Sequence, residues 1–286
     1  MRVKFFVLFF LSMFFFLSCS KNNNVNNETQ KITKDTTNIL QDEKFSEARQ
    51  IVYSLPSPQE ITSIILDQKG LEFNPSLTNN PVFVNKYTTD LARALNLGIY
   101  SADISYVSIF NQKQFAINYI ISAKKLAEYL GILDYFTEEE INEIENNIID
   151  KDKITEIITR AYMRSDAQLQ ENQRDDIGAL ILIGGWVEGM YLATQLAKRQ
   201  NTPNIKLISS IMEQHLTLAL LVDFLNYYNN NKLLRQISKD IFTLDKIFQQ
   251  INTDIDEQGN IIVDQKDFNL ICKQIEKIRN SYINMI

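Results

Sequence analysis

From Phe45 onward, apolar side chains recur at steps of three and four residues, which is the period of one face of an α-helix. The longest pattern of this kind covers 82–109, and its apolar positions are Val84, Tyr87, Leu91, Leu95, Ile99, Ala102 and Tyr106. Asn111 follows as a turn residue, and a partner helix is expected over 115–130. Gly131 should end that helix, because glycine adopts the left-handed conformation that closes many helix C-termini.

Prolines separate several of the other predicted helices. Pro56 and Pro58 divide an opening helix near 44–54 from a second helix near 58–69, and Pro203 interrupts the chain further on. Thr137 and Glu140 form a capping box that predicts a helix at 138–148, and Asp175 and Asp176 should open a helix at 174–200. Further helices are expected at 151–170, 204–228, 231–251 and 265–285.

Signals for β-strands are almost absent from the chain, and residues 259–263 are expected to form at most a short ribbon. Long helices joined by short connections pack as antiparallel neighbours. The sequence therefore predicts an all-α fold, either a single multi-helix bundle or an irregular array of helical hairpins, with about eight to ten helices. We assign this helical domain to residues 44–286, which are numerous enough to form a large core.

The first twenty residues have the layout of an export signal. Arg2 and Lys4 precede an apolar run from Phe5 to Leu17, and Ser18 and Cys19 follow it. A cysteine directly after a small residue is typical of a bacterial lipoprotein, in which residues 1–18 are removed and the new N-terminal Cys19 is acylated. A cleaved signal without lipid is the alternative, because Phe16 occupies a position where lipoprotein signals usually have Leu.

Residues 19–43 are expected to form the lipidated cysteine and a disordered tether. The segment 22–27 contains five Asn in six residues, and the whole stretch has too few apolar side chains to compensate the entropy of ordering. Acyl chains such as palmitate contribute roughly 0.8 kcal/mol per buried methylene, so they would hold the protein at a bilayer surface. The expected location is the envelope of a bacterium, with the outer membrane favoured and the leaflet left open.

The charge of the chain argues against a nucleic-acid partner. The full sequence has a formal net charge of −6, and removal of Arg2 and Lys4 with the signal changes it to −8. Binding to phosphates requires clustered basic residues, and the chain has no basic stripe. An acidic domain is also repelled by anionic lipid, so the affinity for the bilayer must come from the anchor.

The segment 177–193 is the most unusual part of the predicted domain, because its only charged residue is Glu188. At about 100° per residue, Gly178, Gly185 and Gly189 fall within about 40° of one another on a helix. Glycine destabilises a helix interior by about 1 kcal/mol, so such a stripe indicates the close approach of another backbone. We therefore expect a central packed helix, with Gly184 away from the contact. A membrane span is disfavoured, because the run is short and contains Glu188.

A carboxylate within such a segment needs a partner. Glu188 must either meet a cation or several donors, or its pKa must rise. The favoured interpretation is a structural pair with an Arg or Tyr of a neighbouring helix. The alternative is acid–base chemistry shared with Asp103, which lies on one face of the 82–109 helix together with Asn96. Trp186 is expected in the core.

The loop beginning Asp254-x-Asp256 resembles the start of an EF-hand calcium loop. The resemblance then fails, because the twelfth position holds Gln265 where a calcium loop needs a bidentate Glu. Asp254 and Asp256 are thus weak candidates for metal binding, and a solvated turn is favoured.

No cofactor is expected from the remaining sequence. His215 is the single histidine, so a zinc site is not predicted, and the chain has neither a nucleophile elbow nor a phosphate-binding loop. Once Cys19 is acylated, Cys272 is the only thiol. An intramolecular disulfide is then impossible, and an inert buried thiol is predicted.

Four segments also resemble a group of uncharacterised all-helical lipoproteins of Bacteroidetes-type bacteria. They are SLPSPQE at 54–60, KYTTDLARALNLGIYSADISY at 86–106, AKKLAEYLGI at 123–132 and GGWVEGMYLATQLA at 184–197. The resemblance covers most of residues 45–285. It implies an exported, lipidated, helical protein, and it supplies no activity and no catalytic residues.

Two functions therefore remain as hypotheses. The first is a non-catalytic binding or scaffold lipoprotein that engages an envelope protein or glycan. The second is an envelope hydrolase in which Glu188 and Asp103 are the acid and the base. Two carboxyl groups facing an open groove would favour the hydrolase, and a closed core around Glu188 would favour the binding module.

Overall fold

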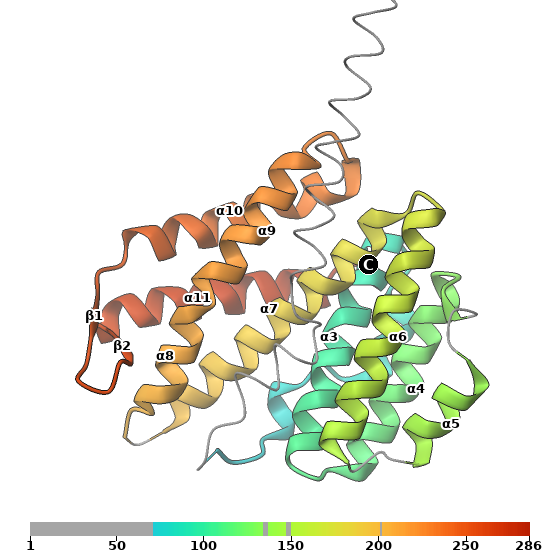
Figure 1. Ribbon diagram of the computed structural model, residues 1–286, viewed down its shortest axis with the longest axis horizontal. Coiled ribbons are helices and arrows are strands. Elements are labelled where there is room, and N and C mark those ends of the chain that lie inside the picture. The colour runs from blue at the N-terminus through green and yellow to red at the C-terminus, as the bar shows by residue number, and fades with distance from the viewer. Residues whose placement is uncertain (1–70, 134–136, 147–149, 201) are drawn as a thin grey trace, which may run out of the picture. The chain divides into compact units, whose positions relative to one another are not determined.

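The computed structural model describes residues 71–286 apart from 134–136, 147–149 and 201 (Figure 1). The predicted signal, Cys19, the tether and the helices near 44–54 and 58–69 lie outside the described residues. The predicted all-α class is confirmed, because the described part contains helices and one two-stranded hairpin.

The elements have the following bounds. Two short 3₁₀ helices come first, η1 (Pro75–Leu77) and η2 (Pro81–Lys86). They are followed by α3 (Asp90–Ile109), α4 (Lys113–Tyr129), α5 (Glu138–Asn146), α6 (Lys151–Glu171), α7 (Asp175–Arg199), α8 (Ile205–Glu213), α9 (His215–Tyr227), α10 (Lys232–Gln250), β1 (Thr253–Ile255), β2 (Ile261–Val263) and α11 (Gln265–Ile283).

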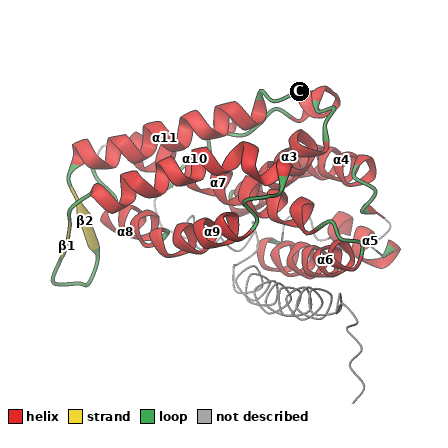
Figure 2. Cartoon of the chain, turned by 90° about the horizontal axis from the view of Figure 1, so that it is seen from above, coloured by secondary structure: helices red, strands yellow, loops and turns green. Residues whose placement is uncertain are grey.

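Helices α3 and α7 form the centre of the described core. Every residue from 177 to 194 is buried, and so is nearly all of α3 from 91 to 108. Helix α4 packs against α3, α8 and α10 pack against α7, and α6 and α11 contact both central helices. Figure 2 shows α10 and α11 running side by side near α7. The expectation that 177–193 is a central packed helix is therefore confirmed.

The long helix predicted over 82–109 is divided in the structure. A 3₁₀ helix occupies Pro81–Lys86, and α3 starts only after Thr89. The hydroxyl of Thr89 accepts a hydrogen bond from the backbone N–H of Ala92 at 3.2 Å. This side-chain cap satisfies a donor of the first turn, so the helix begins at Asp90 although the apolar period extends further back.

The single helix predicted over 204–228 is also wrong, since α8 and α9 are separated at Gln214. The backbone N–H of Gln214 donates to Ile211 in a tight 3₁₀-type turn at 3.2 Å. Its side-chain oxygen accepts a hydrogen bond from the indole N–H of Trp186 at 3.1 Å. This contact ties the bend to the core, and the apolar period alone carries no sign of it.

The turns predicted from single residues are found where expected. Asn111 has a φ of 56° and lies between α3 and α4, while Gly131 has a φ of 68° and follows the end of α4. Strands β1 and β2 pair as an antiparallel hairpin in which Asp254 lies opposite Ile262. This hairpin is the short ribbon that the sequence predicts around 259–263.

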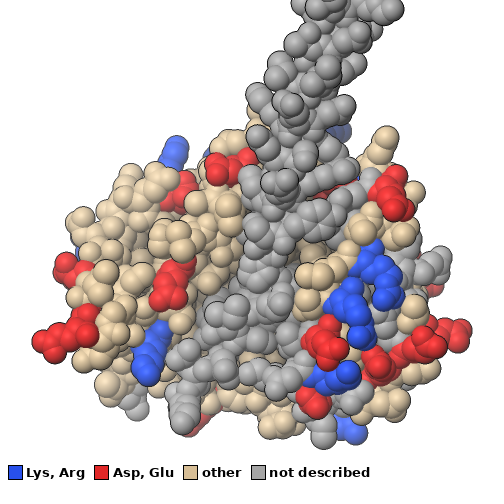
Figure 3. Space-filling view, in the orientation of Figure 1, with Lys and Arg blue, Asp and Glu red and all other residues tan. Residues whose placement is uncertain are grey.

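Charged side chains of both signs are mixed on the surface over α5 and α6, on the right of Figure 3. Arg160 of α6 forms an ion pair with Glu143 of α5 at 2.8 Å and lies 3.5 Å from Glu156 of its own helix. Exposed pairs of this kind contribute at most about 1 kcal/mol each.

Candidate functional site

The backbones of α3 and α7 meet at two glycines, Gly98 and Gly184. A methyl group on Gly184 would overlap the backbone carbonyl of Leu95, and one on Gly98 would overlap that of Ile181. The same methyl group on Gly98 would lie 2.6 Å from the backbone nitrogen of Gly185. Only a residue without a Cβ fits at either position.

The expectation that Gly184 lies away from the contact is therefore wrong, and Gly98 is a contact residue that the sequence argument missed. The helical angle identifies which glycines share a stripe, but it does not show which side of α7 faces α3. A glycine within the apolar pattern of 82–109 was the available signal. Gly178, Gly185 and Gly189 are all buried, and their role as a packing stripe stays a prediction.

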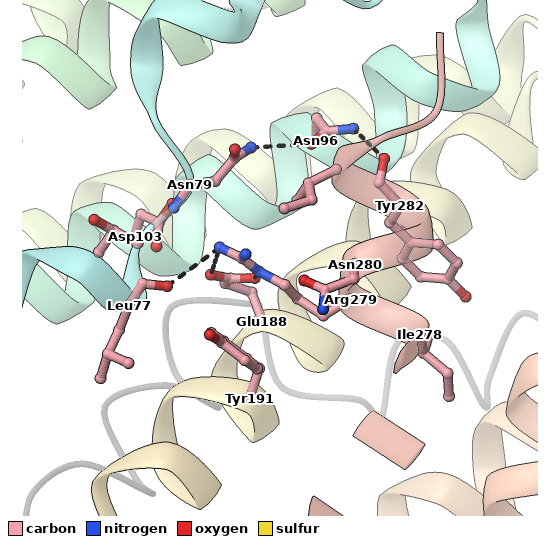
Figure 4. Close-up of polar contacts among 12 residues, drawn as sticks. Leu77, Asn79, Asn96, Asp103, Glu188, Tyr191, Ile278, Arg279, Asn280 and Tyr282 are labelled. Atoms are coloured by element: carbon pink, nitrogen blue, oxygen red, sulfur yellow. Dashed lines mark hydrogen bonds and ion pairs between the residues drawn. The ribbon is translucent and has the colours of Figure 1, made fainter. Parts of the chain in front are cut away.

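Glu188 of α7 forms an ion pair with Arg279 of α11 inside the protein (Figure 4). Its side chain is 0% exposed, and the guanidinium donates to both carboxylate oxygens, at 2.9 Å and 3.1 Å. Arg279 also donates to the carbonyl of Leu77 at 3.2 Å and lies 4.5 Å from the ring centre of Tyr191. The favoured interpretation of Glu188, a structural pair with an Arg of a neighbouring helix, is confirmed.

Electrostatics keeps Arg279 charged in this interior. Burial by itself lowers the pKa of the guanidinium, but the charge and hydrogen bonds of Glu188, together with Asp103 and Tyr191, raise it more, so the net direction is upward. A two-point pair with planar geometry is the arrangement in which a buried charge pair best offsets its loss of hydration.

Asp103 of α3 lies beside this pair and is also completely buried. One of its oxygens, Oδ2, accepts a hydrogen bond from the backbone N–H of Asn79 at 3.1 Å. The other oxygen, Oδ1, has no hydrogen-bond partner within the described part of the chain. Burial raises the pKa of Asp103 well above its ordinary value, and the charge of Glu188 raises it further, whereas Arg279 and the Asn79 N–H act in the opposite direction.

Asn79 connects Asp103 to the second polar residue on the same face of α3. Its side-chain amide donates to the Asn96 side-chain oxygen at 3.1 Å and to the Tyr87 hydroxyl at 3.0 Å. Asn96 in turn donates to the backbone carbonyl of Tyr282 on α11 at 3.1 Å. The predicted alignment of Asn96 with Asp103 is therefore confirmed, and it joins α3 to the 77–79 segment and to α11.

The chemistry open to these groups follows from their number and burial. One guanidinium faces two carboxyl groups, so the cluster is electrically neutral when Asp103 carries a proton. The buried position of Asp103 and the charge of Glu188 both favour this protonated form. Both carboxyl groups are completely buried, so within the described part of the chain the cluster joins helices and does not face solvent.

Two residues of this cluster were missed by the sequence argument. Arg279 lies on the buried face of α11, between Ile275 and Tyr282. The helical period predicts an apolar side chain at this position. A basic residue within an apolar stripe was therefore a usable signal for the partner of Glu188. Asn79 lies outside any periodic segment, and its role had no sequence signal.

The two aspartates of the hairpin, Asp254 and Asp256, have different surroundings. The carboxylate of Asp256 accepts hydrogen bonds from the backbone of Gln258 at 2.9 Å, and from both the backbone and side chain of Asn260 at 2.8 Å. The side chain of Asn260 is the largest cause lowering the pKa of Asp256. Asp254 is exposed on β1. Among the described residues no group of three or more His, Cys, Asp or Glu side chains is placed to hold a metal ion.

The remaining candidates lie apart from the polar cluster. Trp186 is fully buried, as expected of a core residue. Cys272 is a buried thiol whose pKa is raised by burial to about 12, which matches the predicted inert cysteine. His215 begins α9, with Nδ1 2.9 Å from the carbonyl of Met212.

Cys19 lies outside the described residues, so its lipidation stays a prediction, as do the expected lack of a cofactor and of a nucleic-acid partner. Comparison with protein-family models, with curated proteins and with solved structures gives no match to this chain.

Proposed function

We propose that this chain is an exported lipoprotein, anchored in a bacterial envelope membrane through Cys19, whose helical domain binds a partner without catalysing a reaction. The basic start, the apolar run and the Leu17-Ser18-Cys19 sequence support the export and the anchor. The partner would be another envelope protein or a glycan.

The burial of the polar cluster is the observation that supports a domain without catalytic activity. Glu188 is 0% exposed, and both of its oxygens are taken by Arg279. A general acid or base must reach the proton of its substrate at hydrogen-bond distance. The hydrolase alternative would require α3, α7 and α11 to separate, although these helices build the core.

Metabolic labelling with a radioactive fatty acid tests the anchor in living cells. Wild-type protein should incorporate label and fractionate with membranes, and Cys19→Ala should do neither. Ser20→Ala is the matched control, because it changes the next residue without removing the thiol, and it should be labelled like the wild type. Incorporation of label into Cys19→Ala would contradict the lipoprotein assignment.

Two measurements test the absence of catalysis and the presence of a partner. Purified full-length protein should release no fragments from isolated envelope glycan. Chemical crosslinking in intact cells, followed by purification of the anchored protein in detergent, should capture the same envelope component reproducibly. Hydrolysis that disappears in Asp103→Asn would favour the enzyme instead.

A further inference from the structure

An open cavity of about 250 Å³ lies between the α8–α9 bend, α10 and the hairpin, which lie together on the left of Figure 1. It shares no lining residue with the Glu188 cluster. The residues of its wall that matter for binding are Met212, His215, Asp245, Phe248, Thr253 and Ile261.

Two polar side chains of this cavity, Asp245 and His215, present hydrogen-bond acceptors. A backbone carbonyl can only accept, so the contact of His215 Nδ1 with the Met212 carbonyl at 2.9 Å requires a proton on Nδ1. In the neutral ring Nε2 is then an acceptor. Asp245 accepts one hydrogen bond on Oδ2, from Gln249 at 2.7 Å, which leaves Oδ1 for a ligand.

The cavity carries the negative charge of the Asp245 side chain. Within the described part of the chain, Asp245 has no cationic side chain within ion-pair distance, and no Lys or Arg lines the cavity. The rest of the wall is largely apolar, with Phe248 and Ile261 facing the same space as the carboxylate. An anion is disfavoured here, and a cation with an apolar body is complementary to both parts of the wall.

We propose that this cavity binds a primary alkylammonium group, with the nitrogen donating to Asp245 and the carbon chain lying against Phe248 and Ile261. An ammonium has three N–H donors and no acceptor, which matches the acceptors on Asp245 and His215, and its hydrogen bond to a carboxylate is charge-assisted. The group can come from a free amine or from the lysine side chain of a protein. This inference deepens the proposed binding function by naming a site and a ligand class.

The single histidine makes the test specific, because His215 lines the cavity and is the only source of an imidazole signal. Full-length protein labelled with ¹⁵N-histidine, in a non-ionic detergent at pH 8, is titrated with n-butylammonium, n-butanol and butyrate. These probes have similar size and differ in charge. Butylammonium should shift the His215 resonances in a saturable way, and butanol and butyrate should bind at least tenfold more weakly.

Asp245→Asn should weaken butylammonium binding at least tenfold. Asp223→Asn, on the exposed side of α9 and outside the cavity wall, should leave binding unchanged. Asp245→Ala is the second variant if the amide variant does not fold. A titration with Nα-acetyl-lysine amide separates the two sources: tighter binding than butylammonium indicates a protein lysine, and equal or weaker binding indicates a free amine.

Three results would overturn the inference: equal affinity for butanol and butylammonium, no shift of the His215 signal up to the solubility limit of the probe, or unchanged binding by Asp245→Asn. None of them affects the acylation of Cys19 or the crosslinked partner. Failure of this site is therefore distinguishable from failure of the proposed function.

Discussion

Helix α7 and the α8–α9 segment have similar composition and opposite surroundings. By length and composition alone, Asp175–Arg199 and Ile205–Tyr227 are the two stretches of the described chain that are apolar enough to cross a membrane. In the structure 94% of the apolar window is buried in the first and 33% in the second. The first is a core helix of the folded domain, and the second is a bent pair of helices at its surface.

The two regions differ in the residues that their packing contacts require. Helix α7 is buried on all sides, so it needs glycine where α3 crosses it and a cation where Glu188 points inward. Helix α9 buries Leu218, Leu221 and Phe224, while Leu216 remains 63% exposed. Apolar content alone therefore predicts neither burial nor a membrane span. Whether a helix face is buried depends on the elements that pack against it.

The largest effect is expected from removing the cation that compensates Glu188. Arg279→Met leaves two buried carboxyl groups without a positive charge, and loss of one partner of a buried pair costs about 3–5 kcal/mol. Urea denaturation at pH 7 should show this loss. The double variant Glu188→Leu with Arg279→Met should recover most of it, because no unpaired charge remains. A single variant as stable as the wild type would show that the pair is not needed.

A smaller loss is expected at the crossing of α3 and α7. Gly184→Ala places a methyl group against the backbone of Leu95, which cannot rotate away, and overpacking typically costs about 1–3 kcal/mol. The control is Asn226→Ala on the exposed side of α9, which should change the free energy of unfolding by no more than about 0.5 kcal/mol. Stabilisation by Gly184→Ala would exclude the close crossing.

A smaller, pH-dependent change in the free energy of unfolding is expected from Asp103. The pKa of Asp103 is raised in the folded state from an ordinary value of 3.8, so the folded protein holds a proton that the unfolded chain releases. The stability linked to this proton is complete below pH 3.8 and is lost as the pH rises toward the raised pKa.

Asp103→Asn removes this dependence while keeping an acceptor for the backbone N–H of Asn79. The variant should therefore be more stable than the wild type at pH 7, with a smaller advantage at pH 4. Thermal unfolding at the two pH values measures the change. The stability difference between the variant and the wild type is compared at the two pH values. If the variant gains less at pH 7 than at pH 4, Asp103 is not protonated in the folded protein.

The smallest effect is expected on the exposed face of α9. Leu216→Ala should change the free energy of unfolding by no more than about 0.5 kcal/mol, because the side chain is already largely in water. Leu218→Ala, two residues along the same helix and 0% exposed, should cost about 2–5 kcal/mol. Equal losses at both positions would mean that Leu216 packs against another part of the protein.

Features that depend on a few neighbouring residues could be predicted before the fold was known. The helical period, the turn at Asn111, the end of α4 before Gly131 and the acidic first turn of α7 are local signals, and the structure confirms them. The need of Glu188 for a partner was also predictable, because a charge within an apolar helix must be compensated wherever the chain folds.

The contacts between distant residues, by contrast, are visible only in the folded protein. Arg279 lies 91 residues from Glu188, and Asn79 reaches Asp103 and Asn96 from outside any periodic segment. The close crossing uses Gly98 and Gly184, and the bend at Gln214 depends on a hydrogen bond from Trp186. Local signals arise from backbone preferences and from the period of one helix. Contacts between helices depend instead on which faces the whole core brings together.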